Sequence, residues 1–367
     1  MKPAFHLATA FFGFSAALAA PACAQDVADF YAKRDISVVV GTSAGGSYDS
    51  TARLVARHFG RYVPGKPNVI VQNRPGASSR VATNWLYNAG PRDGSVIGAF
   101  SQTLAMSQAL GERGVMYDAA KFNWIGTPTQ PVSVMVAWRA SGVTHLMQAR
   151  DREVIVGATS ATGANFLYPA LANQLFGLRL KVIIGYKGGH EIDLALERGE
   201  IAVRGSATWD EIRGDYPHWV KEKKIVLLMQ NSLKKHPDLP DVPRLVDFAQ
   251  TPEQRQLLDL MGKVAAVGRP WLTNQGVPAE RVKALRGAFG ATMKDAKFLS
   301  ESKRLKLEID PLTGEELQAM AVELVAMPKP LVDLTNAALS RGGTECQRFT
   351  DAKYCEAKKK KKQKAGE

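Results

Sequence analysis

Residues 36–61 read ISVVVGTSAGGSYDSTARLVARHFGR, an apolar run followed by a glycine-rich turn and an amphipathic segment. The unbroken β-branched residues at 38–40 are typical of a strand that is buried on both faces. Apolar residues then recur at helical spacing from Ala52 to Phe59. The glycines between, Gly41, Gly45 and Gly46, let successive backbone N–H groups point at one ligand. The stretch therefore predicts a strand, a turn and a helix start that together hold a small anion such as a carboxylate or phosphate.

Two groups of strand-like runs alternate with helical runs along the chain, which indicates parallel sheets with right-handed crossovers. The 343 residues that follow position 24 exceed one comfortable hydrophobic core, so we expect two lobes. Later helical segments at 251–261, 278–294 and 314–327 are suited to covering the first lobe. The strand-like runs are 36–40, 68–72 and 95–100 in the first group, and 133–138, 154–158, 181–184, 201–204 and 225–230 in the second.

Two further glycine turns open helices in the second group of runs. They are VGATSATGAN at 156–165 and GYKGGH at 185–190. Ligands of open α/β sheets lie outside the carboxyl ends of the strands, so three such turns from two facing lobes can converge on one cleft. A fourth candidate segment follows the strand at 201–204 and contains Ser206, Thr208, Trp209 and Asp210.

The N-terminal end has the features of a secretory signal peptide. Lys2 precedes an apolar run from Leu7 to Ala20, and small residues follow it. Its 14 residues are too few to span a bilayer as a helix. We expect cleavage after Ala24 and export to the periplasm, with lipidation of Cys23 as the less favoured alternative.

Two cysteines remain after that cleavage, in a compartment that permits disulfides, and we predict that Cys346 pairs with Cys355. The net charge of +13 is concentrated in part at the C-terminal end, where residues 358–367 hold six lysines. A lysine run without aromatic neighbours is typical of a solvated tail, which argues against nucleic acid as a partner. We therefore treat residues 346–367 as a C-terminal extension with a disordered, lysine-rich tail.

Several motifs occur in an order that resembles one known family. The sequence is similar to the periplasmic solute receptors of tripartite tricarboxylate transporters, often called Bug receptors. The similarity covers nearly all of the chain after the signal peptide. It rests on GGSYD at 45–49, VIVQNRPGA at 69–77, PRDGSVIG at 91–98, FNWIGTP at 122–128, GYKGG at 185–189 and GVPAERV at 276–282.

The resemblance implies an α/β periplasmic binding protein fold of type 2, with two lobes that each contain a largely parallel sheet flanked by helices. Lobe 1 would comprise residues 25–130 and 232–345, and lobe 2 residues 131–231. Such a receptor closes its lobes around a small organic acid and delivers it to membrane subunits of the transporter. We expect a monomer that binds no nucleic acid.

The resemblance also implies a clamp of turns from both lobes, which holds the ligand's carboxylates largely through backbone N–H groups and water. Asp49 suits a structural role at its helix start and a role beside the ligand equally well, and both interpretations stay open. The candidate ligand-binding residues are Ser43, Ala44, Gly45, Gly46, Ser47, Asp49, Ser160, Gly163, Ala164, Asn165, Tyr186, Lys187, Gly188, Gly189 and Ser206.

One motif favours an enzyme instead. Residues 41–45 fit GxSxG, so a secreted serine hydrolase with Ser43 as nucleophile is the alternative. Such a hydrolase needs an acid and then a histidine after a late strand, and the last third of the chain has no histidine. The chain also lacks a phosphate-binding GxxxxGK[ST] motif and any histidine or cysteine cluster with metal-ligand spacing, so we expect no cofactor and no metal.

Overall fold

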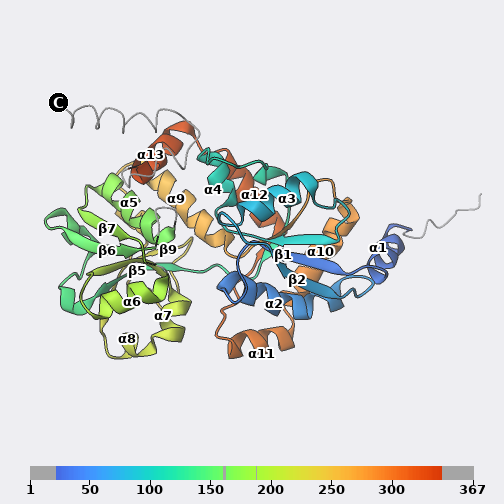
Figure 1. Cartoon of the computed structure of the whole chain (residues 1–367), viewed down its shortest axis with the longest axis horizontal. Coiled ribbons are helices and arrows are strands. Elements are labelled where there is room, and N and C mark those ends of the chain that lie inside the picture. Colours follow the sequence, from blue (N-terminus) through green and yellow to red (C-terminus); the bar gives the residue numbers. More distant parts are fainter. Residues whose placement is uncertain (1–21, 160–162, 187, 341–367) are drawn as a thin grey trace, which may run out of the picture.

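A computed structural model describes residues 22–159, 163–186 and 188–340, which form two sheets that lie side by side (Figure 1). Several expectations lie outside these residues and stay predictions. They concern the signal peptide up to residue 21, Ser160, Lys187, and the disulfide between Cys346 and Cys355.

The first sheet has six strands in the order β11–β4–β10–β3–β1–β2. Its parallel block, β2–β1–β3, places Val38 between Val71 and Ile97, and Val38 is fully buried as the β-branched run predicts. β10 pairs antiparallel with β3 and β4, and β11 pairs antiparallel with β4. The strands are β1 (Ile36–Val40), β2 (Val69–Asn73), β3 (Val96–Ala99), β4 (Asn123–Thr127), β10 (Trp271–Thr273) and β11 (Leu312–Thr313).

The second sheet has five strands in the order β7–β6–β8–β5–β9. Its parallel block is β7–β6–β8, while β5 pairs antiparallel with both β8 and β9. Both sheets are therefore mixed, with a parallel block that ends at the glycine turns. The strands are β5 (Ser133–Trp138), β6 (Val154–Ala158), β7 (Leu180–Ile184), β8 (Val203–Thr208) and β9 (Ile225–Asn231).

Helices flank both sheets (Figure 1). Those packed with the first sheet or its helices are α1 (Ala22–Ala32), α2 (Ser47–Phe59), α3 (Arg80–Ala89), α4 (Leu104–Ala109), α10 (Ala279–Met293), α11 (Ala296–Arg304) and α12 (Gly314–Val325). Those packed with the second are α5 (Ala164–Phe176), α6 (Gly189–Glu197), α7 (Trp209–Asp215), α8 (Pro217–Lys221) and α13 (Lys329–Ser340). α9 (Pro252–Val267) contacts both β9 and α12, and it runs between the two halves.

The chain crosses between the sheets at residues 128–132 and returns through residues 232–270, which include α9. α13, which falls in the range predicted for lobe 1 (232–345), packs on α5 of the second half. Asn336 of α13 also donates from Nδ2 to the Leu110 carbonyl of the first half, at 3.3 Å. One hydrophobic cluster includes Phe100, Leu171 and Leu331, so the halves share apolar packing along this side.

The expected α/β fold with two helix-flanked sheets is confirmed. The expectation that each sheet is largely parallel is wrong, because β10 and β11 in the first sheet and β5 and β9 in the second form antiparallel pairs. Among the residues that the structure describes, no helix combines the length and the apolar character needed to cross a membrane.

Candidate functional site

The first glycine turn joins β1 to α2 and leaves the helix start open. Gly45 has a φ of +85°, which favours glycine, and the turn from Ser43 to Ser47 is exposed. Gly46 is the N-cap of α2, with φ −76° and ψ 170°, and no side chain caps the helix there. The first N–H groups of α2 are therefore available to an anion from outside the protein.

The buried side chain of Asp49 holds this turn together through hydrogen bonds. Its carboxylate accepts from the Gly45 N–H at 2.9 Å, from Arg53 Nε at 3.0 Å and from Asn73 Nδ2 at 2.9 Å. Asn73 Nδ2 also donates to the Thr42 carbonyl at 3.0 Å. Asp49 is only 2% exposed, so these contacts give it the structural role. A direct contact between Asp49 and a ligand stays a prediction.

Replacing Asp49 by asparagine is expected to lower the free energy of unfolding near neutral pH by about 2 kcal/mol. The hydrogen bond from Arg53 is the main cause that lowers the pKa of Asp49 from 3.8 to about 2. Because the folded pKa lies below the unfolded value, this stabilisation is present above pH 3.8 and is lost as the pH falls through about 2. Urea unfolding of both proteins across this range measures it, and a difference that did not narrow in acid would contradict the assignment.

Two turns of the second half also lead into helices without side-chain caps. Gly163 is the N-cap of α5, and Gly188 is the N-cap of α6. Asn165 fastens the first of these turns, because its Oδ1 accepts from the Thr159 N–H at 3.4 Å and from the Thr159 hydroxyl at 3.3 Å. Tyr186, before α6, packs its ring near Gly157, and its role in the wall of a ligand site stays a prediction.

A buried arginine that sequence reasoning missed supports the start of α6. Arg204 on β8 forms ion pairs with Asp193 and with Glu211, the latter at 2.7 Å, and its Nε donates to the Ser206 carbonyl at 3.1 Å. A Cβ added to Gly189 would lie 2.7 Å from Arg204 Nη2, so only glycine fits over the guanidinium. A charged residue inside a strand is the one sequence signal that could have indicated this contact.

A second missed group lies where α2 meets the return from α9. The Tyr48 hydroxyl donates to the Gly268 carbonyl at 3.3 Å and accepts from the Gln102 N–H at 3.2 Å. The next residue, Arg269, binds Thr129 of the first crossing at 3.0 Å. Burial raises the pKa of Tyr48 and lowers that of Arg269. Nothing in the local sequence pattern of these residues indicates that they meet.

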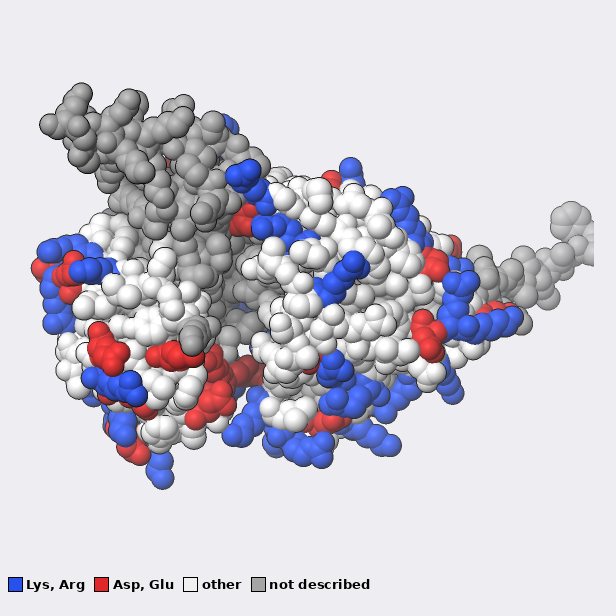
Figure 2. Space-filling view, viewed as in Figure 1, with Lys and Arg blue, Asp and Glu red and all other residues white. Residues whose placement is uncertain are grey.

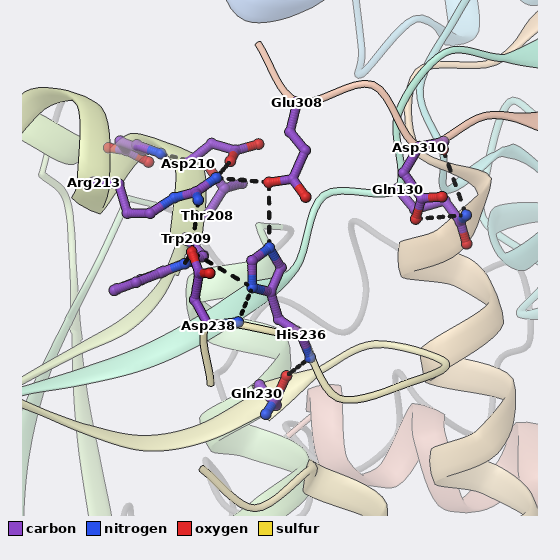
Figure 3. A network of polar contacts seen from close by, with 11 residues as sticks. Gln130, Thr208, Trp209, Asp210, Arg213, Gln230, His236, Asp238, Glu308 and Asp310 are labelled. Carbon is purple, nitrogen blue, oxygen red and sulfur yellow. Dashed lines mark hydrogen bonds and ion pairs between the residues drawn. The ribbon is translucent and has the colours of Figure 1, made fainter. Parts of the chain in front are cut away.

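A polar network fills the region between the crossings (Figure 3). Glu308, from the segment before β11, binds Arg213 of α7 at 2.6 Å and His236 Nε2 at 3.2 Å. Arg213 also pairs with Asp210 and Asp238, so the network links α7 of the second half to the segment before β11 of the first. These ion pairs tie the two halves together in the conformation described.

A cavity of about 600 Å³ adjoins this network and is lined by residues of both crossings, including Thr129, Gln130 and His236. Of the candidate segments named from the sequence, only the fourth reaches it, through Trp209 and Asp210 at the start of α7. Ser206 and Thr208 do not follow the strand as expected, because β8 continues to Thr208 and Ser206 is buried within it. None of the glycine-turn residues lines it. Among the described residues, no hydrogen bond or ion pair joins the first turn to those of the second half, although the surface is hollowed between the halves (Figure 2). Convergence of the turns on one ligand stays a prediction.

The serine hydrolase alternative gains no support from the geometry. In the described part of the chain no hydrogen bond joins Ser43 to a histidine. The histidines that contact carboxylates do so in other parts of the structure. His58 Nε2 binds Glu301 at 2.6 Å, and His236 belongs to the network around Glu308. Across residues 22–159, 163–186 and 188–340, no three His, Cys, Asp or Glu side chains are arranged to hold a metal ion.

Two curated proteins are similar in sequence to this chain, and no family model matches the chain. A UPF0065 protein of Bordetella bronchiseptica is 27% identical over 223 residues, which are 59% of this chain and 64% of that protein. The UPF0065 protein from the tcbD-tcbE intergenic region of Pseudomonas sp. strain P51 is 25% identical over 264 residues, 70% of this chain and 75% of that protein. The chain thus aligns with less than two thirds of the first relative's length.

Solved structures show the same fold over most of the chain. A TctC solute binding protein from Polaromonas has a TM-score of 0.65 at 20% identity and covers 84% of this chain and 99% of its own. The periplasmic binding protein BugD has a TM-score of 0.59 at 20% identity, covering 83% and 98%. The resemblance to the Bug receptors is confirmed. MatC from Rhodopseudomonas palustris, solved with bound malate, has a TM-score of 0.58 at 17% identity and covers 83% of this chain and 99% of its own.

These Bug-like neighbours include proteins named as solute binding or periplasmic binding proteins, and their two-sheet architecture is the one found here. At these identities the structural likeness establishes the fold. The ligand and the transport role must be argued from the chain's own site.

Proposed function

We propose that this protein is a periplasmic solute-binding receptor that captures a small organic carboxylate between its halves and delivers it to the membrane subunits of a tripartite tricarboxylate-type transporter. The observation that carries the proposal is the set of open helix starts at the glycine turns. The N-caps of α2, α5 and α6 are Gly46, Gly163 and Gly188, each after a strand of a parallel block, and none of these helices has a side-chain cap.

A side-chain cap is also missing at the starts of α3, α4, α8 and α10, but their N-cap residues are not glycines. Four other helices have a capped start. The N-cap side chains Thr208, Thr251, Asp295 and Thr313 accept from the N–H groups of α7, α9, α11 and α12. A glycine N-cap offers no such acceptor, so the N–H groups of α2, α5 and α6 must bond to water or to a ligand. Fixed backbone donors at a helix start suit a carboxylate, because no long side chain has to be ordered on binding.

The position of the turns also fits capture between two halves. β1, β6 and β7 all end at these turns, and ligands of α/β sheets bind outside the carboxyl ends of the strands. The relative MatC, which shares the fold, was solved with malate, a small carboxylate. Shared apolar packing along α4, α5, α9, α12 and α13 keeps one side of the halves together, so rotation about residues 128–132 and 232–270 would open the other.

Capture requires no chemical step. Closure needs only a ligand that binds the closed form more tightly than the open form. The closed receptor, a monomer in this proposal, would then present surfaces of both halves to the membrane subunits.

Replacing Ser47 by proline is expected to weaken carboxylate binding about tenfold or more, since a hydrogen bond to a charged group contributes about 1.5–3 kcal/mol. Ser47 is the first residue of α2, where proline is compatible with a helix but removes the N–H. Gly46 before it is already extended, as a residue before proline must be. Calorimetric titration with a panel of mono-, di- and tricarboxylates measures the change.

Ser47→Ala is the matched control, because it removes the hydroxyl and keeps the N–H donor. Ala164→Pro, at the first residue of α5, makes the same deletion in the second half. Both proline variants should lose affinity while Ser47→Ala retains it. If the proline variants bound every acid as tightly as the unchanged protein, the helix starts would not be the ligand clamp.

A further inference from the structure

Hydrogen bonds hold Arg269 where the first crossing, residues 128–132, meets the end of the return segment after α9. Its backbone N–H donates to Thr127 Oγ1 at 3.0 Å, and its Nη1 donates to Thr129 Oγ1 at 3.0 Å. Both threonines are buried, with Thr127 at the end of β4 and Thr129 in the crossing itself. The half-buried arginine side chain is thereby held over the segment that connects the two halves.

The groups around Arg269 come from both halves. Gly268, just before it, accepts from the hydroxyl of Tyr48, the second residue of α2. The Tyr48 hydroxyl therefore lies at the backbone next to Arg269. Asp210, from the first turn of α7, is near enough for its charge to act on the guanidinium. Thr129 and Asp210 also line the cavity at the crossings, so Arg269 lies next to that cavity.

The positive charge of Arg269 has no carboxylate partner among the described residues. Asp210 instead forms its ion pair with Arg213, at 2.6 Å. The contrast with other arginines is clear, since Arg53 pairs with Asp49 and Arg204 pairs with two carboxylates. Charges that leave water are normally paired, and arginine does not lose its proton in proteins. A half-buried, unpaired guanidinium therefore calls for an anion from outside the chain.

We propose that Arg269, with Tyr48 beside it, forms a side-chain subsite for a second anionic group of the ligand, so that the protein selects small acids with two carboxylates over monocarboxylates. This inference rests on the proposed function, in which the first carboxylate binds the helix starts. The planar guanidinium matches a carboxylate through two parallel hydrogen bonds, which a backbone clamp of single donors does not offer.

A structural role is the competing explanation, because Arg269 also braces Thr129. Three variants separate the two roles. Arg269→Gln removes the positive charge. Arg269→Lys keeps the charge but lacks the planar guanidinium. Thr129→Val removes the hydroxyl that accepts from Arg269 and keeps the guanidinium. The probes are succinate, glutarate and adipate, each titrated by calorimetry against the monocarboxylate of equal carbon number.

We expect the unchanged protein to prefer a dicarboxylate, and Arg269→Gln to lose about 10- to 100-fold in affinity for it while its monocarboxylate affinity changes less than about threefold. The dicarboxylate affinity of Arg269→Lys should lie between those of the unchanged protein and of Arg269→Gln. Thr129→Val should retain the preference for dicarboxylates. Equal losses for both acids, loss of the preference in Thr129→Val, or an unchanged preference in Arg269→Gln would overturn the subsite and leave the receptor proposal standing. Failure of the unchanged protein to bind any carboxylate would overturn the receptor proposal itself, and the subsite with it.

Discussion

Replacing Gly268 by alanine is expected to lower the free energy of unfolding by about 3 kcal/mol or more. Gly268 has φ +63° and ψ −118°, a conformation that side-chain-bearing residues rarely adopt. An added Cβ would lie 1.9 Å from the Thr129 carbonyl oxygen and 2.9 Å from Thr127 Oγ1. Because the first clash is with backbone of the crossing, no side-chain rotation relieves it.

The same substitution should disturb the site, since the Gly268 carbonyl receives the Tyr48 hydroxyl and the adjoining Arg269 binds the crossing. Urea unfolding gives the stability change. Gly177→Ala is the matched control, because Gly177 also has a positive φ, of +65°, but an added Cβ meets no atom within 4 Å. That control should cost only about 1 kcal/mol. Equal losses in the two variants would show that backbone conformation alone, without close approach to the crossing, sets the cost.

Replacing Arg204 by methionine is expected to destabilise the protein by about 3–5 kcal/mol near neutral pH. Arg204 and Asp193 are both almost fully buried, at 4% and 1% exposed, so removing the guanidinium leaves an uncompensated carboxylate. Glu211, the other partner, is partly exposed and can turn to water. Burial already raises the pKa of Asp193, and loss of Arg204 should raise it further.

The sign of the pH dependence follows from that raised pKa. Below pH 3.8, the pKa of Asp193 in the unfolded chain, Asp193 is protonated in both the folded and the unfolded state. The variant therefore loses the least stability in that range. The loss grows as the pH rises toward the folded pKa, because ionisation then favours the unfolded chain. Unfolding titrations in urea at several pH values measure this slope.

The double variant Arg204→Met with Asp193→Leu tests the cause. Replacing both members of a buried ion pair by apolar residues of similar size is often neutral, so most of the lost stability should return. If the double variant were as unstable as the single one, the arginine would be acting through its shape over Gly189 and not through its charge.

The strand runs predicted from hydrophobic pattern correspond closely to the structure, because each is decided by neighbours within a few residues. The run at 36–40 is β1, and those at 133–138 and 154–158 are β5 and β6. β4 (Asn123–Thr127) and β10 (Trp271–Thr273) were not predicted. Three residues are too few for a periodicity, and β10 exists only because β3 and β4 lie on either side of it.

The candidate site also has parts that could be predicted from the sequence and parts that could not. The glycine turns before α2, α5 and α6 were predicted directly, since glycine composition and a following helical period are local signals. Arg204 and Arg269 were missed, because an arginine's role depends on whether a carboxylate reaches it. Asp193 reaches Arg204 from α6, whereas none of the described carboxylates pairs with Arg269.

The α/β class, the glycine turns that precede helices and the resemblance to a receptor family all follow from the amino-acid sequence alone. They do so because backbone conformation and strand or helix period are properties of short segments. Long-range packing, in contrast, sets which charges are paired, which glycines lie against the backbone of another segment and how Tyr48, Arg269 and Thr129 come together. The contacts of Tyr48 and Thr129 join distant parts of the chain, with 220 positions between Tyr48 and Gly268 and 140 between Thr129 and Arg269. No local sequence pattern identifies partners that are so far apart.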